Sequence, residues 1–182
     1  MRSLRFVCAM LVLFVAAASL RGQEGSPSTD EHKWLGQLVG EWETSSELVF
    51  GPGMPPVKAE GKESVRKIGG LWTVSEHTGS LMGTEFTGVM TLGYDPEKKK
   101  YIGTWVDSVH NHLWHYLGTL DDAKKVLTLE AEGPNPAAPG KKGKFRDVIT
   151  LKDKDTKVMT SSMQMEDGSW VQFMTVTYKR KK

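Results

Sequence analysis

From residue 40 onward, apolar and polar residues alternate in short runs that are separated by turn residues, a pattern typical of β-strands with one buried face. Valine, threonine, tyrosine, tryptophan and phenylalanine, which favour strands, are frequent in these runs. No later segment has helical spacing over a useful length, so parallel β–α–β units are not expected. We predict ten strands, near residues 41–50, 58–68, 70–79, 84–94, 99–107, 112–120, 125–132, 143–152, 157–165 and 169–179.

One short helix is predicted before the strands. Trp34, Leu35 and Leu38 recur at helical spacing, Asp30 is a suitable N-cap, and Gly40 is the expected end of the helix.

Ten consecutive strands joined mostly by short turns form an antiparallel meander, which exposes two unpaired edges unless the sheet closes on itself. We therefore predict an all-β fold, an up-and-down antiparallel β-barrel of about ten strands, as a single domain over residues 30–182. A barrel of this size can enclose one small ligand. The alternative is a two-sheet sandwich, whose side chains would fill that space.

The first residues have the layout of a secretory signal peptide. Arg2 and Arg5 form a positive region, residues 6–18 are apolar, and cleavage after Ala18 would follow a small residue. We predict a signal peptide over 1–18, a flexible leader over 19–29, and export to the periplasm or the medium.

Charge and cysteine content exclude some classes of function. Lysine and arginine number 24 against 22 aspartates and glutamates, and Arg2 and Arg5 account for the excess, so the exported chain is balanced and nucleic-acid binding is not expected. Cys8, the only cysteine, lies in the predicted signal peptide, which leaves the exported chain without a disulfide. No later segment is apolar enough to predict a membrane span.

Gly40-Glu41-Trp42, directly after the predicted helix, resembles the Gly-x-Trp signature of the calycin superfamily, which includes lipocalins and fatty-acid-binding proteins. The resemblance implies a calycin-like barrel in which a basic residue of the last strand packs over this tryptophan near the closed end. Arg180 matches that position, and Lys179 matches it less well. Gly40, Trp42 and Arg180 are thus the expected barrel-closing signature.

A second resemblance covers roughly residues 30–180. The chain is identified as a member of an uncharacterised bacterial family, domain of unknown function 1579, which implies fold and export and leaves the activity open. Its matching segments are His32-Lys33-Trp34-Leu35, Gly93-Tyr94-Asp95-Pro96, Tyr101-Ile102-Gly103-Thr104-Trp105-Val106-Asp107-Ser108 and Val176-Thr177-Tyr178-Lys179-Arg180.

Candidate ligand-binding residues follow from the alternation. Trp72 and Glu76 share one face of their strand, and Trp105 and Asp107 share a face of theirs, so each tryptophan that faces the core brings a carboxylate with it. Arg146 is the candidate partner for such a carboxylate, although its strand equally allows it to face water. We predict a site lined by Trp72, Glu76, Trp105, Asp107 and Arg146, a mixture of aromatic and polar groups typical of small-molecule sites.

The histidines raise metal, haem and acid–base chemistry as alternatives to simple ligand binding. His110, His112 and His115 lie close to Asp107, which allows a zinc-type site or simply a polar rim loop. Nitrobindin-like barrels of the calycin superfamily hold haem through a histidine near the C-terminus, but no histidine follows His115. We therefore predict no cofactor. Two acid–base pairs are also conceivable on spacing, Glu76 with His77 and Asp107 with His110.

Six tryptophans, with Met159, Met163, Met165 and Met174, supply adaptable apolar surface. The favoured function is the binding of a small, mainly apolar ligand in a barrel cavity. The alternatives are a metal-dependent or acid–base enzyme that uses the same cavity, and a structural or partner-binding protein of the cell envelope.

Overall fold

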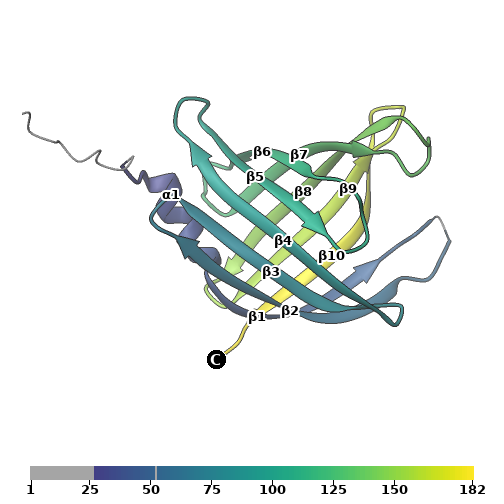
Figure 1. Cartoon of the computed structure of the whole chain (residues 1–182), viewed down its shortest axis with the longest axis horizontal. Coiled ribbons are helices and arrows are strands. Elements are labelled where there is room, and N and C mark those ends of the chain that lie inside the picture. The colour runs from purple at the N-terminus through teal and green to yellow at the C-terminus, as the bar shows by residue number, and fades with distance from the viewer. Residues whose placement is uncertain (1–26, 52) are drawn as a thin grey trace, which may run out of the picture.

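The computed structural model describes residues 27–51 and 53–182 (Figure 1). A short helix, α1 (Asp30–Leu35), continues into one 3₁₀ turn, η1 (Gly36–Leu38), and ten strands follow. The strands are β1 (Gly40–Leu48), β2 (Val57–Ile68), β3 (Trp72–Leu81), β4 (Thr84–Asp95), β5 (Lys100–Asp107), β6 (Trp114–Leu120), β7 (Val126–Pro134), β8 (Lys142–Asp153), β9 (Thr156–Gln164) and β10 (Trp170–Arg180). The predicted signal peptide over 1–18 and residues 19–26 of the predicted leader lie outside the described residues.

The strands form one closed antiparallel barrel. Each strand pairs with its neighbours in the chain, and β1 also pairs with β10, from Trp42 opposite Arg180 to Leu48 opposite Met174. Closure leaves no free edge. The predicted barrel is confirmed, and the alternative of a two-sheet sandwich is wrong.

The alternation of residues along the chain located all ten strands. Each predicted boundary lies within two residues of the observed one. Two details of the predicted helix are wrong. Thr29, which has extended backbone, is the N-cap in place of Asp30, and its N–H donates to His32 Nδ1 at 3.0 Å. The helix also ends before Gly40, which is the first residue of β1.

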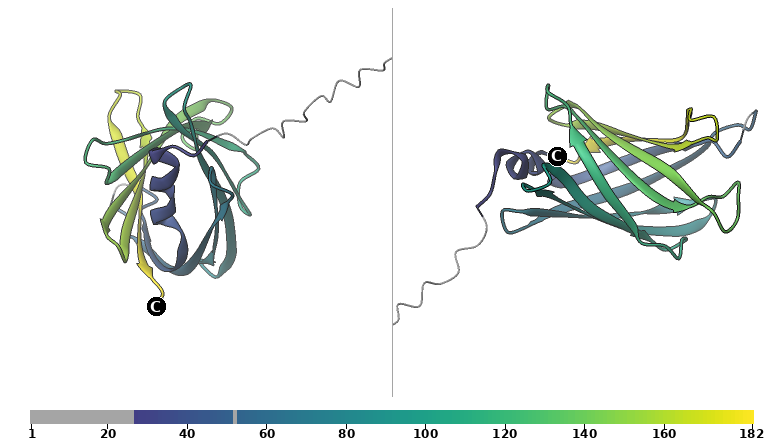
Figure 2. Two further views of the ribbon diagram at one scale, coloured as in Figure 1. Left: turned by 90° about the vertical axis from the view of Figure 1, so that its left-hand side faces the viewer. Right: turned by 90° about the horizontal axis from the view of Figure 1, so that it is seen from above.

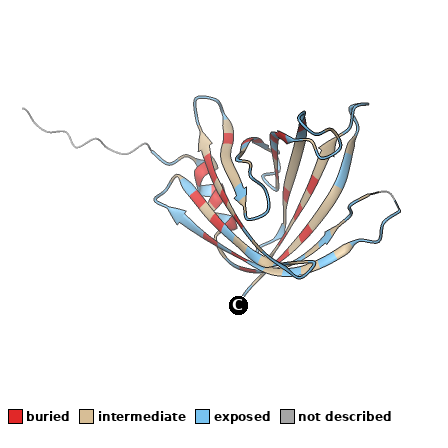
Figure 3. Cartoon of the chain, turned by 45° about the vertical axis from the view of Figure 1, so that its right-hand side comes forward, coloured by how far each residue is buried: buried red, intermediate tan, exposed pale blue. Residues whose placement is uncertain are grey.

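The helix lies across one end of the barrel, here called the closed end (Figure 2). Trp34, Leu35 and Leu38 are buried there in one cluster with residues of the strands, among them Tyr101 and Leu129. Buried positions occur on the helix and alternate with more exposed positions along the strands (Figure 3). This alternation follows from the pleat, because successive side chains point to opposite faces of a strand.

Arg180, in the last strand, binds β1 and the segment between the helix and β1 at the closed end. Its guanidinium carbon lies 4.1 Å from the centre of the Trp42 ring, and its Nη1 and Nη2 atoms donate to the carbonyls of Val39 (2.6 Å) and Gln37 (3.0 Å). Trp42 Nε1 donates to the carbonyl of Leu38 at 3.0 Å. One arginine thus contacts the tryptophan of β1 and the segment that leads into it, whereas Lys179 bonds Thr156 instead.

Gly40 is the tightest point of this arrangement. Its φ of +137° is one that other residues rarely adopt, and a Cβ atom there would lie 2.3 Å from Arg180 Nη1. The glycine of the Gly-x-Trp segment is therefore required both by its backbone conformation and by the arginine beside it.

We expect Gly40→Ala to destabilise the barrel by about 2–4 kcal/mol, since it adds a steric conflict with Arg180 to backbone strain of about 1–3 kcal/mol. Gly168→Ala is the matched control, because Gly168 has a φ of +84° and open space around its Cβ position. Urea unfolding followed by circular dichroism measures both. Equal losses in the two variants would contradict the role given to Arg180.

Candidate functional site

A layer of polar side chains crosses the interior of the barrel beyond the closed end. Its members, here called the polar layer, come from β2, β3, β6, β8 and β9 and are Glu63, Ser75, His77, Tyr116, Asp147, Lys157 and Ser161. The central contact is an ion pair between Lys157 Nζ and Glu63 Oε2. Two strands separate β2 from β9 in the barrel, so this pair spans the interior.

Lys157 is enclosed on the closed-end side of the polar layer. Its Nζ atom lies 4.6 Å from the centre of the Trp42 ring and 4.5 Å from that of the Tyr178 ring, and only 4% of the side chain is exposed. Burial lowers the pKa of Lys157, and the Glu63 carboxylate opposes that shift. The ammonium therefore has Glu63 and two aromatic rings as its immediate surroundings.

His77 is the member of the layer next to the ion pair. Its Nε2 atom lies 3.2 Å from Glu63 Oε1 and 3.2 Å from Ser75 Oγ. Burial lowers the pKa of His77, Glu63 opposes the shift and Lys157 reinforces it, so the imidazole is neutral at pH 7. Because the serine and the carboxylate approach the same ring nitrogen, this trio lacks the geometry of a serine nucleophile relay, which uses both nitrogens.

Tyr116 and Asp147 form the second polar contact, across β7. The Tyr116 hydroxyl donates to Asp147 Oδ2 at 2.5 Å. Burial raises the pKa of Asp147, while Ser161 and Tyr116 donate hydrogen bonds that oppose the shift. Burial also raises the pKa of Tyr116, and the neighbouring Asp147 adds to this.

Aromatic side chains occupy the inner face on the far side of the polar layer from the helix. The Trp105 ring lies 5.1 Å from that of His77 and is stacked 6.2 Å from Phe86, and Trp114 meets Phe145 edge-on at 4.8 Å. All of these rings are only partly buried, as are two methionines. This region, here called the open half, comprises Phe86, Trp105, Trp114, Phe145, Met163 and Met174.

Asp107, at the end of β5, stabilises the loop between β5 and β6 at the rim of the open half. It accepts hydrogen bonds from Trp105 Nε1 (2.8 Å) and from the backbone N–H groups of Val109 (2.9 Å) and His110 (2.7 Å). Desolvation is the largest influence on the pKa of Asp107 and raises it, but hydrogen bonds, first that of the His110 side chain, together hold the pKa below its usual value. Asp107 is thus an ionised residue that fixes both the loop and Trp105.

Two of the predicted site residues, Trp105 and Asp107, lie on the inner face of β5. Trp72 and Glu76 lie on the outer face of β3, opposite to the face expected from the sequence. Trp72 covers Gly93 of the neighbouring strand from outside, where a Cβ would approach its ring to 2.5 Å. The inner positions of β3 are instead Thr73, Ser75 and His77, so the predicted Glu76–His77 pair is split between two faces.

Arg146 also lies on the outer face. Its Nη2 atom donates to Glu130 Oε1 at 2.7 Å, and its guanidinium lies 3.9 Å from the centre of the Trp170 ring. The prediction that Arg146 lines the cavity is therefore wrong, because an ion pair and an aromatic ring are available to it on the outside.

The three candidate metal-binding histidines do not converge. His110 Nδ1 contacts Asp107 at 3.0 Å, His112 Nε2 contacts the carbonyl of Glu132 at 3.3 Å, and His115 is exposed on the outer face of β6. Within residues 27–51 and 53–182, no three His, Cys, Asp or Glu side chains are grouped as a metal site would require. Of the predicted acid–base pairs, only Asp107–His110 is in contact.

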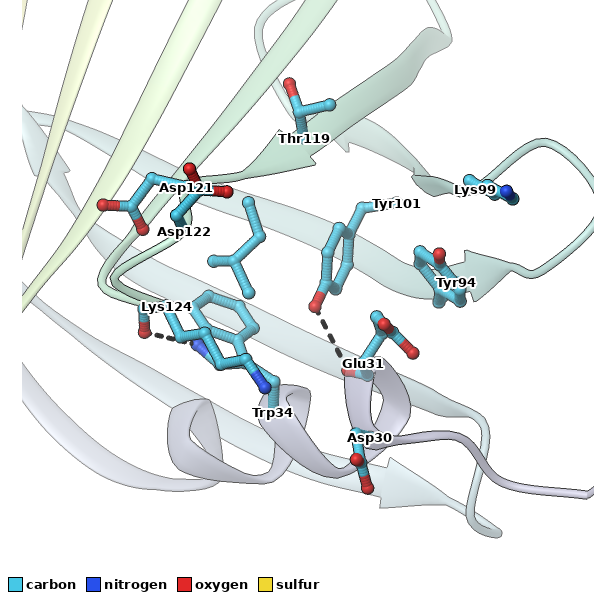
Figure 4. Close-up of a pocket in the computed structure, with 11 residues that line it drawn as sticks. Asp30, Glu31, Trp34, Tyr94, Lys99, Tyr101, Thr119, Asp121, Asp122 and Lys124 are labelled. Carbon is cyan, nitrogen blue, oxygen red and sulfur yellow. Dashed lines mark hydrogen bonds between the residues drawn. The ribbon is translucent and has the colours of Figure 1, made fainter.

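A pocket of about 290 Å³ lies between the helix and the barrel at the closed end (Figure 4). Trp34, Tyr94 and Tyr101 line it, with charged residues of α1 and of the β4–β5 and β6–β7 loops. Its polar groups dock the helix: Trp34 Nε1 donates to the carbonyl of Lys124 (2.9 Å), and the Tyr101 hydroxyl donates to that of Glu31 (3.3 Å). The pocket thus lies at the packing interface between the helix and the barrel, and Trp34 and Tyr101 use their polar groups there to hold the helix in place.

Sequence reasoning missed most of the polar layer, including Glu63, Lys157 and Asp147. A signal for one of them was present. Glu63 follows Val57, Ala59 and Gly61 at alternate positions of β2 and precedes Val65, so it interrupts a small apolar face. A charge at such a position marks a buried polar group, although its partner 94 residues away could not be read from the pattern.

Glu63→Gln is expected to destabilise the protein by about 3–5 kcal/mol, because it leaves the Lys157 ammonium buried without a counter-ion. The double variant Glu63→Gln/Lys157→Met removes both charges and is expected to recover most of that loss. Guanidinium unfolding of the wild type and the variants provides the comparison. A double variant as unstable as the single one would show that packing, and not charge, is responsible.

The neutral state of His77 predicts a pH dependence of stability. Below pH 6.5, the ordinary pKa of the group, the unfolded chain binds a proton that folded His77 resists, so stability falls as pH drops. We therefore expect the difference in unfolding free energy between wild type and His77→Phe to shift against the wild type from pH 7.5 to pH 5. The opposite trend in urea titrations would mean that Glu63 keeps His77 charged.

Two solved structures are similar to this chain, and the first of them supports the fold. A crystal structure of Rv2717c from M. tuberculosis matches with a TM-score of 0.62 and 13% identity, covering 86% of this chain and all (100%) of the other. A redesigned β-barrel, mFAP0, in a structure with bound DFHBI, matches with a TM-score of 0.44 and 12% identity over 79% of this chain and 99% of that one. A search of curated proteins found no match.

Neither helix in the described part of the chain has the length and hydrophobicity needed to cross a bilayer. The family described as "Protein of unknown function (DUF1579)" matches residues 27–180, from just before α1 to the end of β10, and the chain therefore belongs to that family.

Proposed function

We propose that this protein binds a small, mainly apolar ligand in the open half of its barrel. The supporting observation is the contrast between the two ends of the interior. At the closed end Leu127 and Leu129 are fully buried, whereas Trp105, Phe86 and Phe145 face inward at the open half and keep part of their surface exposed. The part of these inward-facing rings that the protein leaves uncovered is surface that an apolar ligand would cover.

The polar layer would form the floor of this site. His77 lies between the Glu63–Lys157 pair and the Trp105 ring, so a ligand resting on Trp105 would reach His77 before any other member of the ion-pair cluster. Aromatic walls with a few placed polar groups at the base provide both affinity and orientation.

The loops at the open end expose apolar side chains, whereas two loops at the helix end are mostly charged. In an up-and-down barrel, the loops that follow β1, β3, β5, β7 and β9 lie at the end opposite the helix. Several large apolar side chains stand exposed on them: Val49, Phe50, Met54, Met82, Val109, Leu113 and Met165. The helix-end loops over 96–99 and 121–125 are instead rich in Asp, Glu and Lys. An apolar rim favours entry of an apolar ligand at the open end.

Two tryptophans provide a matched test of this proposal. Trp105→Ala removes an inner wall, and we expect it to weaken the binding of the neutral apolar dye Nile red by roughly tenfold or more, the size of loss that a central aromatic contact causes. Trp72→Ala removes a tryptophan from the outer face of β3, outside the proposed site, and is expected to leave the affinity unchanged. Fluorescence titration measures both, with thermal unfolding as the check on folding.

Equal loss in the two variants, or no saturable binding to the wild type, would overturn the proposal and favour a structural role for a filled barrel.

A further inference from the structure

We infer that the ligand carries a hydrogen-bond-donating head group without negative charge, as a long-chain alcohol or amine does, and that His77 accepts its hydrogen bond. This inference rests on the proposed function and names the class of ligand for the same site. It argues against a carboxylate ligand, because a carboxylate buried in the barrel would be costly without a cation within reach.

The charges on the inner face disfavour an anion. Within residues 27–51 and 53–182, the carboxyl groups that face the interior are Glu63, Asp107 and Asp147. Asp107 is ionised at the rim of the open half, and Glu63 stands between the open half and the nearest ammonium. A ligand carboxylate would thus enter beside like charges in a region of low dielectric, which costs affinity.

The interior lysine is not available to such a ligand. Lys157 is paired with Glu63, lies against Trp42 and Tyr178, and has a side chain that is only 4% exposed. A carboxylate could reach its Nζ atom only by displacing Glu63. That exchange would replace one buried ion pair by another and leave Glu63 without a partner.

His77 provides a hydrogen-bond acceptor, which suits a ligand that donates a hydrogen bond and not one that carries a carboxylate. Its Nε2 atom lies 3.2 Å from both Glu63 Oε1 and Ser75 Oγ. The carboxylate only accepts hydrogen bonds and the serine hydroxyl can accept one, so we assign the proton of the neutral ring to Nε2. Nδ1 then holds the lone pair, and the described part of the chain places no hydrogen-bond donor on it. The side chain is 13% exposed, the most open in the Glu63–His77–Lys157 cluster, and its ring lies beside Trp105. A donor that enters along Trp105 meets this acceptor.

The test uses four ligands with the same ten-carbon chain, titrated calorimetrically into the full-length protein at pH 7.5 below their micelle concentrations. They are 1-decanol, decylamine, decanoate and 1-methoxydecane, whose ether oxygen cannot donate. We expect decanol or decylamine to bind at least about tenfold more tightly than decanoate, a factor that corresponds to about 1.4 kcal/mol. Which of the two binds more tightly tells a neutral donor from a cationic one.

Decanoate binding as tightly as the better donor would overturn the inference and leave the proposed function standing. Absence of binding by all four ligands would overturn both.

Variants of His77 locate the contact. His77→Phe keeps a ring but removes the acceptor, and it should weaken decanol binding about threefold to tenfold, the range for one neutral hydrogen bond, without changing 1-methoxydecane. His77→Gln retains an acceptor and should restore much of the preference for decanol. Glu76→Gln, on the outer face of the same strand, is the control and should change neither ligand. Equal losses for decanol and its methyl ether in His77→Phe would overturn the assignment of His77.

Discussion

The pairing of β1 with β10 is the constraint on which the rest of this structure depends. Because it closes the sheet, every strand acquires an inner and an outer face, and residues far apart in the chain meet across the interior. Glu63 and Lys157 are 94 positions apart and form the central ion pair. Arg180, at the end of β10, completes the closure by binding the segment that leads into β1 and by covering Trp42.

Closure divides the interior into regions of different chemistry. The helix and the first layer of strand residues fill the closed end, where Leu127 and Leu129 have no exposed surface. The polar layer lies beyond it, and its charges are paired because an isolated buried charge would be very costly. Aromatic and thioether groups follow in the open half, with part of their surface uncovered. A buried ion pair of this kind contributes little net stability, because its mutual attraction mainly offsets the cost of removing both charges from water.

Trp72, Glu76 and Arg146 lie outside the barrel for one shared reason. Period-two alternation shows that Trp72 and Glu76 share a face, but it does not show which face is inside. Tryptophan is usually buried, so the face with Trp72 was expected to be the inner one. In the barrel, Trp72 instead covers a glycine from outside, and the inner positions of β3 belong to Thr73, Ser75 and His77. Trp105 and Asp107 do lie on the inner face, because the aromatic face of β5 is the inner one.

The sequence by itself determined the helix, the ten strands and the need for the sheet to close, because these follow from local alternation, from turn residues and from the cost of exposed edges. The contact between Trp42 of Gly40-Glu41-Trp42 and Arg180 was implied by the resemblance to the calycin signature and not by the local pattern. Only the tertiary structure decided which face of each strand is inside and which buried charges meet. That decision depends on the register and closure of the whole barrel, and no segment contains it, since the partners of Glu63, His77 and Asp147 come from different strands.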